Sequence, residues 1–490
     1  MIFLICVLIL AAVLYSLLIN RILGLPPGPP PLPFIGNMLS FSWEMDRKFL
    51  EWKEKYGTIF TVWMPFPIVV FGDKKVLHEH VIKNGDVYLA KKNPEQLMEL
   101  MCGGLYGLVF EDNSVVKEQR RFALRALHDV GFGSSHLEDT VHSYAEEVIA
   151  RWKAQDGQKI DVSDYIMCAT GNIIWNITFG INLPFDDPLL PRFKEIQLEM
   201  LPLMAGPYLQ FIELFPFLKN FDFFFGNHLR KLHKLNDDSN EFIREAIETI
   251  KKNSSTDDLA GSYVEAFLAE VRRREDNGQD RGSFSESQLF FSASSIWGAG
   301  FDTTVTVLRM CIHYLIEHPA VQRKIHAELD EKIGTRRIKF EDNKILPYCN
   351  AYMQEVYRLA NALPLNFMRK VQQDTVVEGW TLRAGTTVLP QFSMVHLDPK
   401  EFERPEYFCP ERHLNEKGEF VKDARITPFS VGKRSCLGEG LARMELFVML
   451  LSFVQHLSFE SPTVVPAEMV CVPGFTRTPK PFEVIVRARN

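Results

Sequence analysis

The stretch that decides the expected fold is Phe429-Ser430-Val431-Gly432-Lys433-Arg434-Ser435-Cys436-Leu437-Gly438. A single cysteine is usually a small buried apolar residue. Here one glycine stands four residues before Cys436 and another stands two residues after it, which suits a tight turn and the close approach of a flat ligand. Arg434 is placed to reach an anionic group of that ligand. An apolar helical pattern begins at Leu441, so Cys436 precedes a helix N-terminus, which favours a thiolate.

The composition is that of a large globular protein. The chain has 490 residues, of which 46% are hydrophobic and 38 are Phe, so a sizeable core can form without disulfides. Its 8 cysteines show no CxxC spacing, which argues against a zinc site and against a disulfide framework, and suits a reducing compartment. The net charge of −7 gives no reason to expect nucleic-acid binding.

The N-terminus departs from this composition. Residues 1–19 carry no charge, which is close to the ~20 residues that a helix needs to cross a bilayer. A cleaved signal peptide would need a basic start and a small-residue cleavage site, and neither is evident. Arg21 follows the span, which favours a cytosolic body. We therefore predict a membrane signal anchor over residues 1–20, a stiff proline-rich hinge over 21–36, and a single catalytic domain over 37–490.

The body is predicted to be mainly helical with small β-sheets, an α+β class. Residues 58–63 and 68–71, separated by two prolines, predict a β-hairpin. Most of the rest has helical periodicity, with loops expected at 251–261 and 272–283.

One helix is expected to cross the whole body. Ser283-Phe-Ser-Glu286 has the pattern of a capping box and Pro319 ends the apolar pattern, giving about 30 residues or ~45 Å. Ala299-Gly300-Phe301-Asp302-Thr303-Thr304 stands in its middle, although Gly and Thr are poor helix formers. Such a violation often marks a functional site. The structural alternative is a glycine kept for packing, with Thr hydroxyls bonded back to the preceding turn.

The stretch around Cys436 resembles the haem-binding loop of the cytochrome P450 superfamily, Phe-x-x-Gly-x-Arg-x-Cys-x-Gly, at every fixed position. The likeness extends over practically the whole chain and is greatest to animal microsomal family-two members. It implies a cytochrome P450 fold and haem b, with Cys436 as the axial ligand of the haem iron and thiolate ligation that favours O–O cleavage. The other positions that match the family's cofactor contacts are Phe429, Arg434, Gly438, Ala299, Arg120 and Arg369.

The resemblance also assigns roles to the polar residues of these motifs. Asp302 and Thr303 correspond to the catalytic pair that organises water and relays protons, beside Ala299 and Gly300, which leave room for dioxygen. Arg434, Arg120 and Arg369 would bind haem propionates, as guanidinium groups suit anions. Val116 replaces a tryptophan of the family beside Arg120.

A third motif implies a structural role. Glu355 and Arg358 lie on one helix face and would pair with Arg412 of Pro410-Glu-Arg412. His413 stands where the family commonly has Phe, and we interpret this as a minor departure.

The implied activity is NADPH- and O2-dependent monooxygenation of a lipophilic small molecule at the endoplasmic reticulum membrane, with the catalytic domain facing the cytosol. Electrons would come from NADPH-cytochrome P450 reductase, with cytochrome b5 as a second candidate donor. Lys117, Arg121 and Arg125 recur at four-residue spacing and, with Lys433, suggest a basic docking face.

The substrate stays open among steroids, fatty acids and foreign lipophiles. The segments that match the family's substrate-lining regions are apolar: residues 98–110, 201–217, 296–304, 363–367 and 474–476. Residues 201–217 continue into the Phe-rich stretch 221–225, which is either buried core or a region that dips into the membrane.

Two other functions compete. A haem-thiolate isomerase or synthase would need no reductase, but such members typically lose the acid–Thr pair that is intact here. A non-catalytic membrane haem- or lipid-binding protein would need neither the thiolate loop nor the relay pair. Reductase-dependent NADPH consumption separates the monooxygenase from both.

Overall fold

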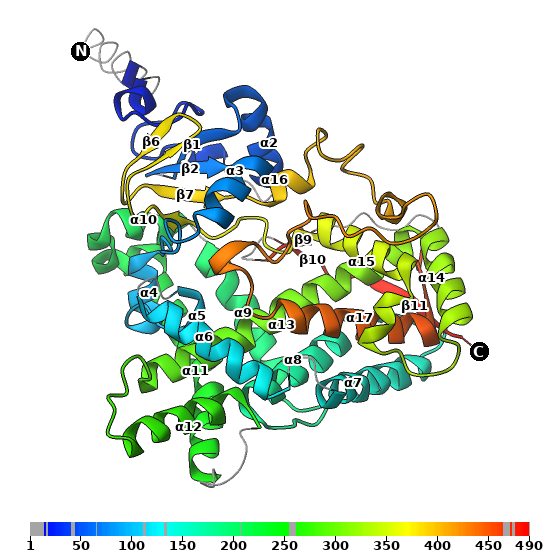
Figure 1. Cartoon of the computed structure of the whole chain (residues 1–490). Coiled ribbons are helices and arrows are strands. Elements are labelled where there is room, and N and C mark those ends of the chain that lie inside the picture. Colours follow the sequence, from blue (N-terminus) through cyan, green and yellow to red (C-terminus); the bar gives the residue numbers. More distant parts are fainter. Residues whose placement is uncertain are drawn as a thin grey trace. The chain divides into compact units, whose positions relative to one another are not determined.

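The computed structural model describes residues 14–15, 18–40, 45–64, 66–110, 114–131, 135–205, 207–253, 261–463, 471–472 and 476–489. These residues are mainly helical with small sheets, as the sequence predicts (Figure 1). Contacts divide the chain into two compact units. We call Met1–Pro94, Leu363–Tyr407 and Asp423–Cys436 the sheet unit, and Glu95–Ala362, Phe408–Lys422 and Leu437–Asn490 the helical unit.

The predicted membrane anchor falls mostly on residues 1–13 and 16–17, which lie outside the described residues. In the part of the chain that the structure describes, no helix combines the length and apolar character needed to span a bilayer.

The sheet unit is built on a four-stranded sheet with the order β1-β2-β7-β4 (Figure 1). The predicted hairpin is confirmed: β1 (Ile59–Trp63) and β2 (Pro67–Phe71) are antiparallel, with Thr61 opposite Val69. Strand β7 (Thr387–Pro390) runs parallel to β2, and β4 (Arg369–Lys370) is antiparallel to β7. Apolar clusters cover both faces of β2, which is why its sequence is a continuous apolar run. The other elements of this unit are η1 (Met38–Ser40), α2 (Met45–Tyr56), α3 (Lys74–Val76), η2 (Leu77–Lys83), β5 (Thr375–Val377), β6 (Trp380–Leu382), α16 (Ser393–His396) and η6 (Gly432–Arg434).

The proline-rich segment is attached to strand β1. The Thr61 backbone N–H donates to the Pro27 carbonyl at 2.9 Å, and the Thr61 hydroxyl donates to the Pro26 carbonyl at 2.8 Å. A Cβ at Gly28 would lie 1.8 Å from the Thr61 carbonyl oxygen, so only glycine allows this approach. The predicted hinge is therefore extended but fixed to the sheet along these residues.

The helical unit surrounds the long helix α13 (Glu286–Glu317), which packs against α5, α8, α15 and α17 (Figure 1). Its remaining helices are α4 (Glu95–Cys102), α5 (Gly107–Phe110), α6 (Ser114–Asp129), α7 (Ser135–Lys153), α8 (Ser163–Phe179), α9 (Leu189–Ala205), α10 (Pro207–Leu214), η3 (Pro216–Phe225), α11 (His228–Asn253), α12 (Tyr263–Asp276), α14 (Pro319–Lys332), η4 (Phe340–Lys344), α15 (Pro347–Ala360), η5 (Pro410–His413) and α17 (Glu439–His456). Its strands form two antiparallel sheets: β3 (Lys159–Asp161), β11 (Glu483–Ala488) and β8 (Leu457–Glu460), and β9 (Cys471–Val472) with β10 (Thr478–Pro479).

The predicted long helix is confirmed, but its cap is two residues later than predicted. The Ser285 hydroxyl accepts from the Gln288 backbone N–H at 3.1 Å, so Ser285 is the N-cap. Ser283 is taken by another contact, since its hydroxyl donates to the Glu118 carboxylate at 2.6 Å. The helix has 32 residues, or ~48 Å, and ends before Pro319.

The two predicted loops are shorter than expected. Helix α12 continues to Asp276, so the loop prediction is wrong for residues 272–276. Arg273 and Arg274 both donate to Glu270, one turn earlier, which supports the helix here. Helix α11 likewise continues to Asn253, and residues 254–260 lie outside the described part.

Candidate active site

The Cys436 loop is held in a strained turn of the sheet unit. The Cys436 backbone N–H donates to the Phe429 carbonyl at 2.8 Å, and the Cys436 residue itself is exposed. Ser430 and Gly432 have φ of +62° and +74°. A Cβ at Gly432 would lie 2.7 Å from the Val81 carbonyl oxygen, so glycine is required there by conformation and by space. The tight turn predicted before the cysteine is confirmed.

Gly438 has a different explanation. It is the N-cap of α17, with φ of −90°, a conformation that any residue can adopt. A Cβ at Gly438 would meet no described atom within 4 Å. Neither the backbone nor the packing of the described chain therefore demands glycine at this position. Helix α17 begins at Glu439, three residues after Cys436, so the positive end of its dipole is close in the chain to the thiol.

Two of the predicted anion-binding arginines are buried in the sheet unit. Arg434 and Arg369 are 7% and 4% exposed, so the alternative that they are ordinary surface arginines is wrong. The Arg434 Nε donates to the Leu89 carbonyl at 2.9 Å, and Arg369 lies in β4, paired with Val388 of β7. A guanidinium group has the geometry to bind an anion, so both positions remain candidates for this role.

Helix α6 carries the third arginine. Arg120 is half-buried, whereas Lys117, Arg121 and Arg125 are exposed, so the basic stripe is the more accessible part of the helix. Val116, one turn before Arg120, is fully buried in the apolar core.

The mid-helix motif of α13 has both features of the structural alternative, a glycine kept for packing and a Thr hydroxyl bonded back to the preceding turn. A Cβ at Gly300 would lie 3.1 Å from Ile174 Cδ1 of α8, so Gly300 allows two helices to pack closely. The Thr303 hydroxyl donates to the Ala299 carbonyl at 2.7 Å. Packing is therefore the reason that the structure supplies for Gly300. Thr303 is half-buried and Ala299 exposed, so both remain accessible.

Asp302 has a hydrogen-bond partner that sequence reasoning missed. The Thr476 hydroxyl donates to Asp302 Oδ2 at 2.6 Å. Loss of hydration on burial raises the pKa of Asp302, while the Thr476 hydroxyl and the Arg309 guanidinium act in the opposite direction without cancelling the rise. Residues 474–476 were predicted only as a substrate-lining segment, and residues 474 and 475 lie outside the described residues. The available signal was the alternation of Thr476 and Thr478, which places both hydroxyls on one side of an extended segment.

The predicted structural trio is confirmed and has a fourth member. Arg358 donates to both oxygens of Glu355, at 2.8 and 2.9 Å, and Arg412 Nε donates to one of them at 3.0 Å. His413 Nε2 donates to the other oxygen at 2.8 Å, and the Cys409 backbone N–H also donates to Glu355. Glu355, Arg358 and His413 are all buried. Burial alone would raise the pKa of Glu355, but the hydrogen bonds from Arg358 and His413 lower it to about 2.

The Phe-rich region divides into a buried part and an exposed part. Tyr208, Leu209 and Ile212 belong to a buried cluster, so the core interpretation holds for this part of residues 201–217. Helix η3 has no buried residue, so the core interpretation is wrong for residues 221–225. Its most exposed phenylalanines are Phe217, Phe223 and Phe224, at 58%, 61% and 72%.

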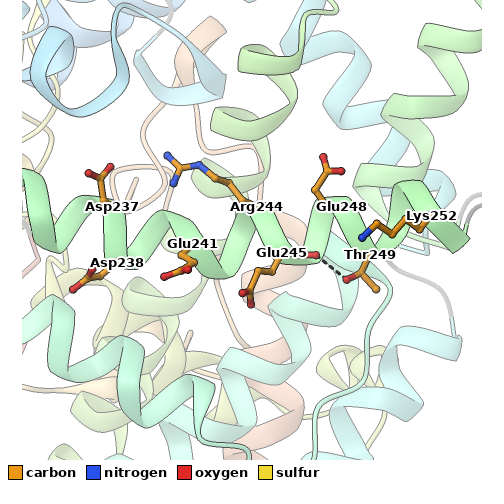
Figure 2. Close-up of a pocket in the computed structure, with 8 residues that line it drawn as sticks. All are labelled: Asp237, Asp238, Glu241, Arg244, Glu245, Glu248, Thr249 and Lys252. Atoms are coloured by element: carbon orange, nitrogen blue, oxygen red, sulfur yellow. Dashed lines mark hydrogen bonds between the residues drawn. The ribbon is translucent and has the colours of Figure 1, made fainter.

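A cleft of about 840 Å³ lies elsewhere in the helical unit. Figure 2 shows that its eight lining residues all come from α11, and five of them are acidic. It contains none of the predicted site residues, and its charged lining does not suit an apolar substrate. We therefore place the candidate active site at the Cys436 loop and the α13 motif, each within its own unit.

Comparison with known proteins identifies the family. The cytochrome P450 family model matches residues 26–486. "Probable cytochrome P450 CYP36A1" of Caenorhabditis elegans is 36% identical over 472 residues, 95% of both chains. Cytochrome P450 2K1 of Oncorhynchus mykiss and cytochrome P450 2A5 of Mus musculus are each 31% identical over 95% of this chain, and over 92% and 94% of their own. The chain therefore belongs to the cytochrome P450 family, haem monooxygenases whose haem b is bound through a cysteine thiolate.

The residues of the Cys436 loop fit this cofactor. Cys436 is exposed and its thiolate would be a soft metal ligand, and a Cβ at Gly438 would meet no described atom, so neither position is closed to a bound group. The buried guanidinium of Arg434 in the same loop suits the anionic edge of such a group.

Proposed function

We propose that this protein is a haem-thiolate monooxygenase that inserts one oxygen atom of O2 into a lipophilic small molecule, with electrons from NADPH. The observation that carries the proposal is the Cys436 loop: an exposed cysteine in a fixed turn, with open space at Gly438 and a buried arginine two residues before it. Steroids, fatty acids and foreign lipophiles are all compatible with the apolar lining segments.

Each matched residue receives a role in holding the cofactor. Cys436 would bind the iron, and the backbone hydrogen bond from its N–H to the Phe429 carbonyl fixes the loop that would present the thiolate. Arg434, Arg369 and Arg120 would bind the propionates. Gly438 and Ala299 would leave space for the cofactor and for dioxygen. The haem, when bound, supplies the activation of dioxygen, and the thiolate favours O–O cleavage.

Asp302 and Thr303 handle protons on the helical unit. Burial raises the pKa of Asp302 above its usual range, so this carboxyl holds a proton more readily than an exposed one, as suits a relay group. Thr303 supplies a hydroxyl that can orient water. The intact pair also favours a monooxygenase over a haem-thiolate isomerase or synthase, because a rearrangement needs no protons from solvent.

The electron donor is proposed to be NADPH-cytochrome P450 reductase, with cytochrome b5 as a second donor. The support is the exposed basic stripe of Lys117, Arg121 and Arg125, which suits an acidic partner. Glu118, beside Lys117, is paired with Arg274 and therefore reduces the positive charge of the stripe less than a free carboxylate would. Lys433 belongs to the sheet unit and pairs with Asp86.

The protein is proposed to reside in the endoplasmic reticulum membrane with its catalytic domain facing the cytosol. The uncharged residues 1–19 support an anchor. The exposed phenylalanines of η3 support a second contact with the lipid, because a soluble surface rarely exposes several large apolar side chains together.

The test is the carbon monoxide difference spectrum of the reduced protein. We expect a strongly red-shifted Soret band in the wild type, its loss in Cys436→Ala and its retention in Cys102→Ala, which changes a half-buried cysteine of helix α4. A red-shifted band that persists in Cys436→Ala would overturn the assignment of the ligand. Well-folded protein supplied with haem that shows no band would overturn the proposed function. Reductase-dependent NADPH consumption then separates the monooxygenase from an isomerase and from a carrier.

A further inference from the structure

Three hydroxyl groups form a continuous chain that ends on Asp302. The Thr476 hydroxyl lies 2.6 Å from Asp302 Oδ2 and 3.0 Å from the Thr478 hydroxyl. The Thr478 hydroxyl lies 2.9 Å from the Thr306 hydroxyl. Thr476 is 4% exposed and Thr306 is fully buried. The chain therefore runs from the candidate relay acid into the interior of the helical unit.

The hydroxyl chain follows from the spacing of residues on helix α13 and from their spacing at β10. Asp302 and Thr306 are four residues apart, so they lie on the same face of α13. Thr478 begins β10 and Thr476 lies two residues before it, and the contact between their hydroxyls shows that both lie on the same side of this segment. The two elements pack together, so that Asp302 meets Thr476 and Thr306 meets Thr478 across their contact.

The direction of the hydrogen bonds follows from the carboxylate. An ionised Asp302 can only accept, so Thr476 donates its single proton to Asp302 and must accept from Thr478. Thr478 has then used its own proton and accepts from Thr306. All three donors point toward Asp302, and such aligned hydroxyls strengthen one another. The arrangement stabilises the charged form of Asp302.

Few charged groups lie near the hydroxyl chain in the described part of this unit. Arg309, two turns after Asp302 on α13, is the cation that acts on Asp302. Arg309 is itself buried, and it also interacts electrostatically with Asp161, Asp164 and Cys471. Among the described residues, Asp302 therefore has no direct ion pair, and the Thr476 hydroxyl is its hydrogen-bond donor.

We propose that Thr476 is a positioning residue for Asp302, and that the hydroxyl chain of Thr306, Thr478 and Thr476 fixes the orientation and protonation of its carboxyl. The inference rests on the proposed function, since Asp302 matters for turnover only if the protein is a monooxygenase. Thr476 itself is not a catalytic residue, because it acts through Asp302. The competing explanation is that Thr476 only fastens β10 to α13.

The decisive measurement is the infrared titration of the Asp302 carboxyl in the full-length holoprotein. The signal of the protonated acid is identified by its absence in Asp302→Asn. In Thr476→Val we expect the titration to move upward by about one pH unit, a tenfold change in proton affinity, because a hydrogen bond to the charged form is lost. Thr476→Ser keeps the hydroxyl and should titrate like the wild type. Thr178→Val, which removes a buried hydroxyl that bonds to Ile174, should also leave the Asp302 signal unchanged.

A second readout connects the titration to turnover. Thr476→Val should release more peroxide per NADPH than the wild type, in the same direction as Thr303→Ala, and Thr476→Ser should restore coupling. An unchanged Asp302 titration in Thr476→Val would overturn the inference, as would a shift that Thr476→Ser reproduces. A wild-type protein without reductase-dependent NADPH consumption would instead overturn the proposed function, and the infrared titration would still decide whether Thr476 positions Asp302. A melting curve for each variant identifies any that fail to fold.

Discussion

Glu355 accepts hydrogen bonds from its own helix and from one segment more than fifty residues later in the sequence. It is fully buried, and a buried carboxylate is tolerated only when its oxygens are well matched by donors. Arg358 comes from the same helix, α15, whereas Arg412 and His413 come from η5, more than fifty residues later. Removing any donor therefore leaves part of a buried charge unmatched, and the cost should exceed that of an ordinary surface hydrogen bond.

His413→Phe tests the fourth member of this cluster. Phe is the residue common in the family at this position, yet here it would remove the donor to one oxygen of Glu355. We expect a loss of about 2 kcal/mol in the free energy of unfolding at neutral pH, measured by chemical denaturation. The folded pKa of Glu355, about 2, lies below its usual value of 4.5, so its stabilisation is complete above pH 4.5 and is lost as the pH falls toward 2.

His413→Phe should raise the folded pKa of Glu355, so the loss of stability with acid should be shallower than in the wild type. His413→Gln is the matched control, because its amide can still donate and should recover part of the stability. If His413→Phe unfolds at the same denaturant concentration as the wild type, the hydrogen bond from His413 contributes no net stability.

Spacing placed Glu355 and Arg358 on one helix face, and the family resemblance added Arg412, but neither predicted the fourth member. Glu355 and Arg358 follow the helical period, and Arg412 lies in a short motif. The replacement of Phe by His413 was interpreted as minor because a sequence does not show which residues turn inward. Thr476 was missed as a partner of Asp302 for a similar reason: the two are 174 residues apart, and no local pattern connects them.

At the scale of elements, the sequence offers two candidate N-caps for helix α13. Ser283 and Ser285 are both good N-caps by residue type. Ser285 is the one used, because Glu118 and Gln119 of α6 already bind Ser283. The existence, central motif and end of this helix could be predicted from the sequence, whereas its first turn depends on another helix.

The two glycines of α13 give a prediction at this scale. A Cβ at Gly298 would meet no described atom within 4 Å, whereas one at Gly300 would lie 3.1 to 3.3 Å from Ile174. Gly→Ala in a helix interior stabilises by up to about 1 kcal/mol when space allows. We therefore expect Gly298→Ala to raise the melting temperature of the protein, and Gly300→Ala to leave it unchanged or lower it.

The second substitution Ile174→Val, combined with Gly300→Ala, provides the control. Val lacks Cδ1, the nearest atom, but keeps the two Cγ atoms at 3.2 and 3.3 Å, so the double variant should be less destabilised than the sum of the two single variants. Equal effects of Gly298→Ala and Gly300→Ala would mean that close packing against α8 is not why Gly300 is a glycine.

At the scale of the whole molecule, buried carboxyls set opposite dependences of stability on pH. Glu355 stabilises the folded chain above its usual pKa, as argued above. Glu445 of α17 behaves in the opposite way. It is fully buried, and neither of its oxygens has a hydrogen-bond partner in the described part of the chain. Burial raises the pKa of Glu445 to about 8. Nothing in the sequence distinguished Glu445 from the other polar residues of an apolar helix.

Glu445→Gln tests this consequence. The folded state binds the proton of Glu445 more tightly than the unfolded state does, so the stability from this group is complete below pH 4.5 and is lost as the pH rises through about 8. Gln is uncharged and of similar size, so the variant lacks this loss. The free energy of unfolding of the variant should therefore rise relative to that of the wild type between pH 5 and pH 9, by on the order of a few kcal/mol. The measurement is the difference in the free energy of unfolding at each pH, since any fixed effect of the amide cancels from the slope.

Glu331→Gln, on the exposed side of α14, is the control, and its free energy of unfolding should differ from that of the wild type by the same amount at every pH. A flat difference for Glu445→Gln as well would mean that Glu445 gains a donor or water that keeps it ionised in the folded protein.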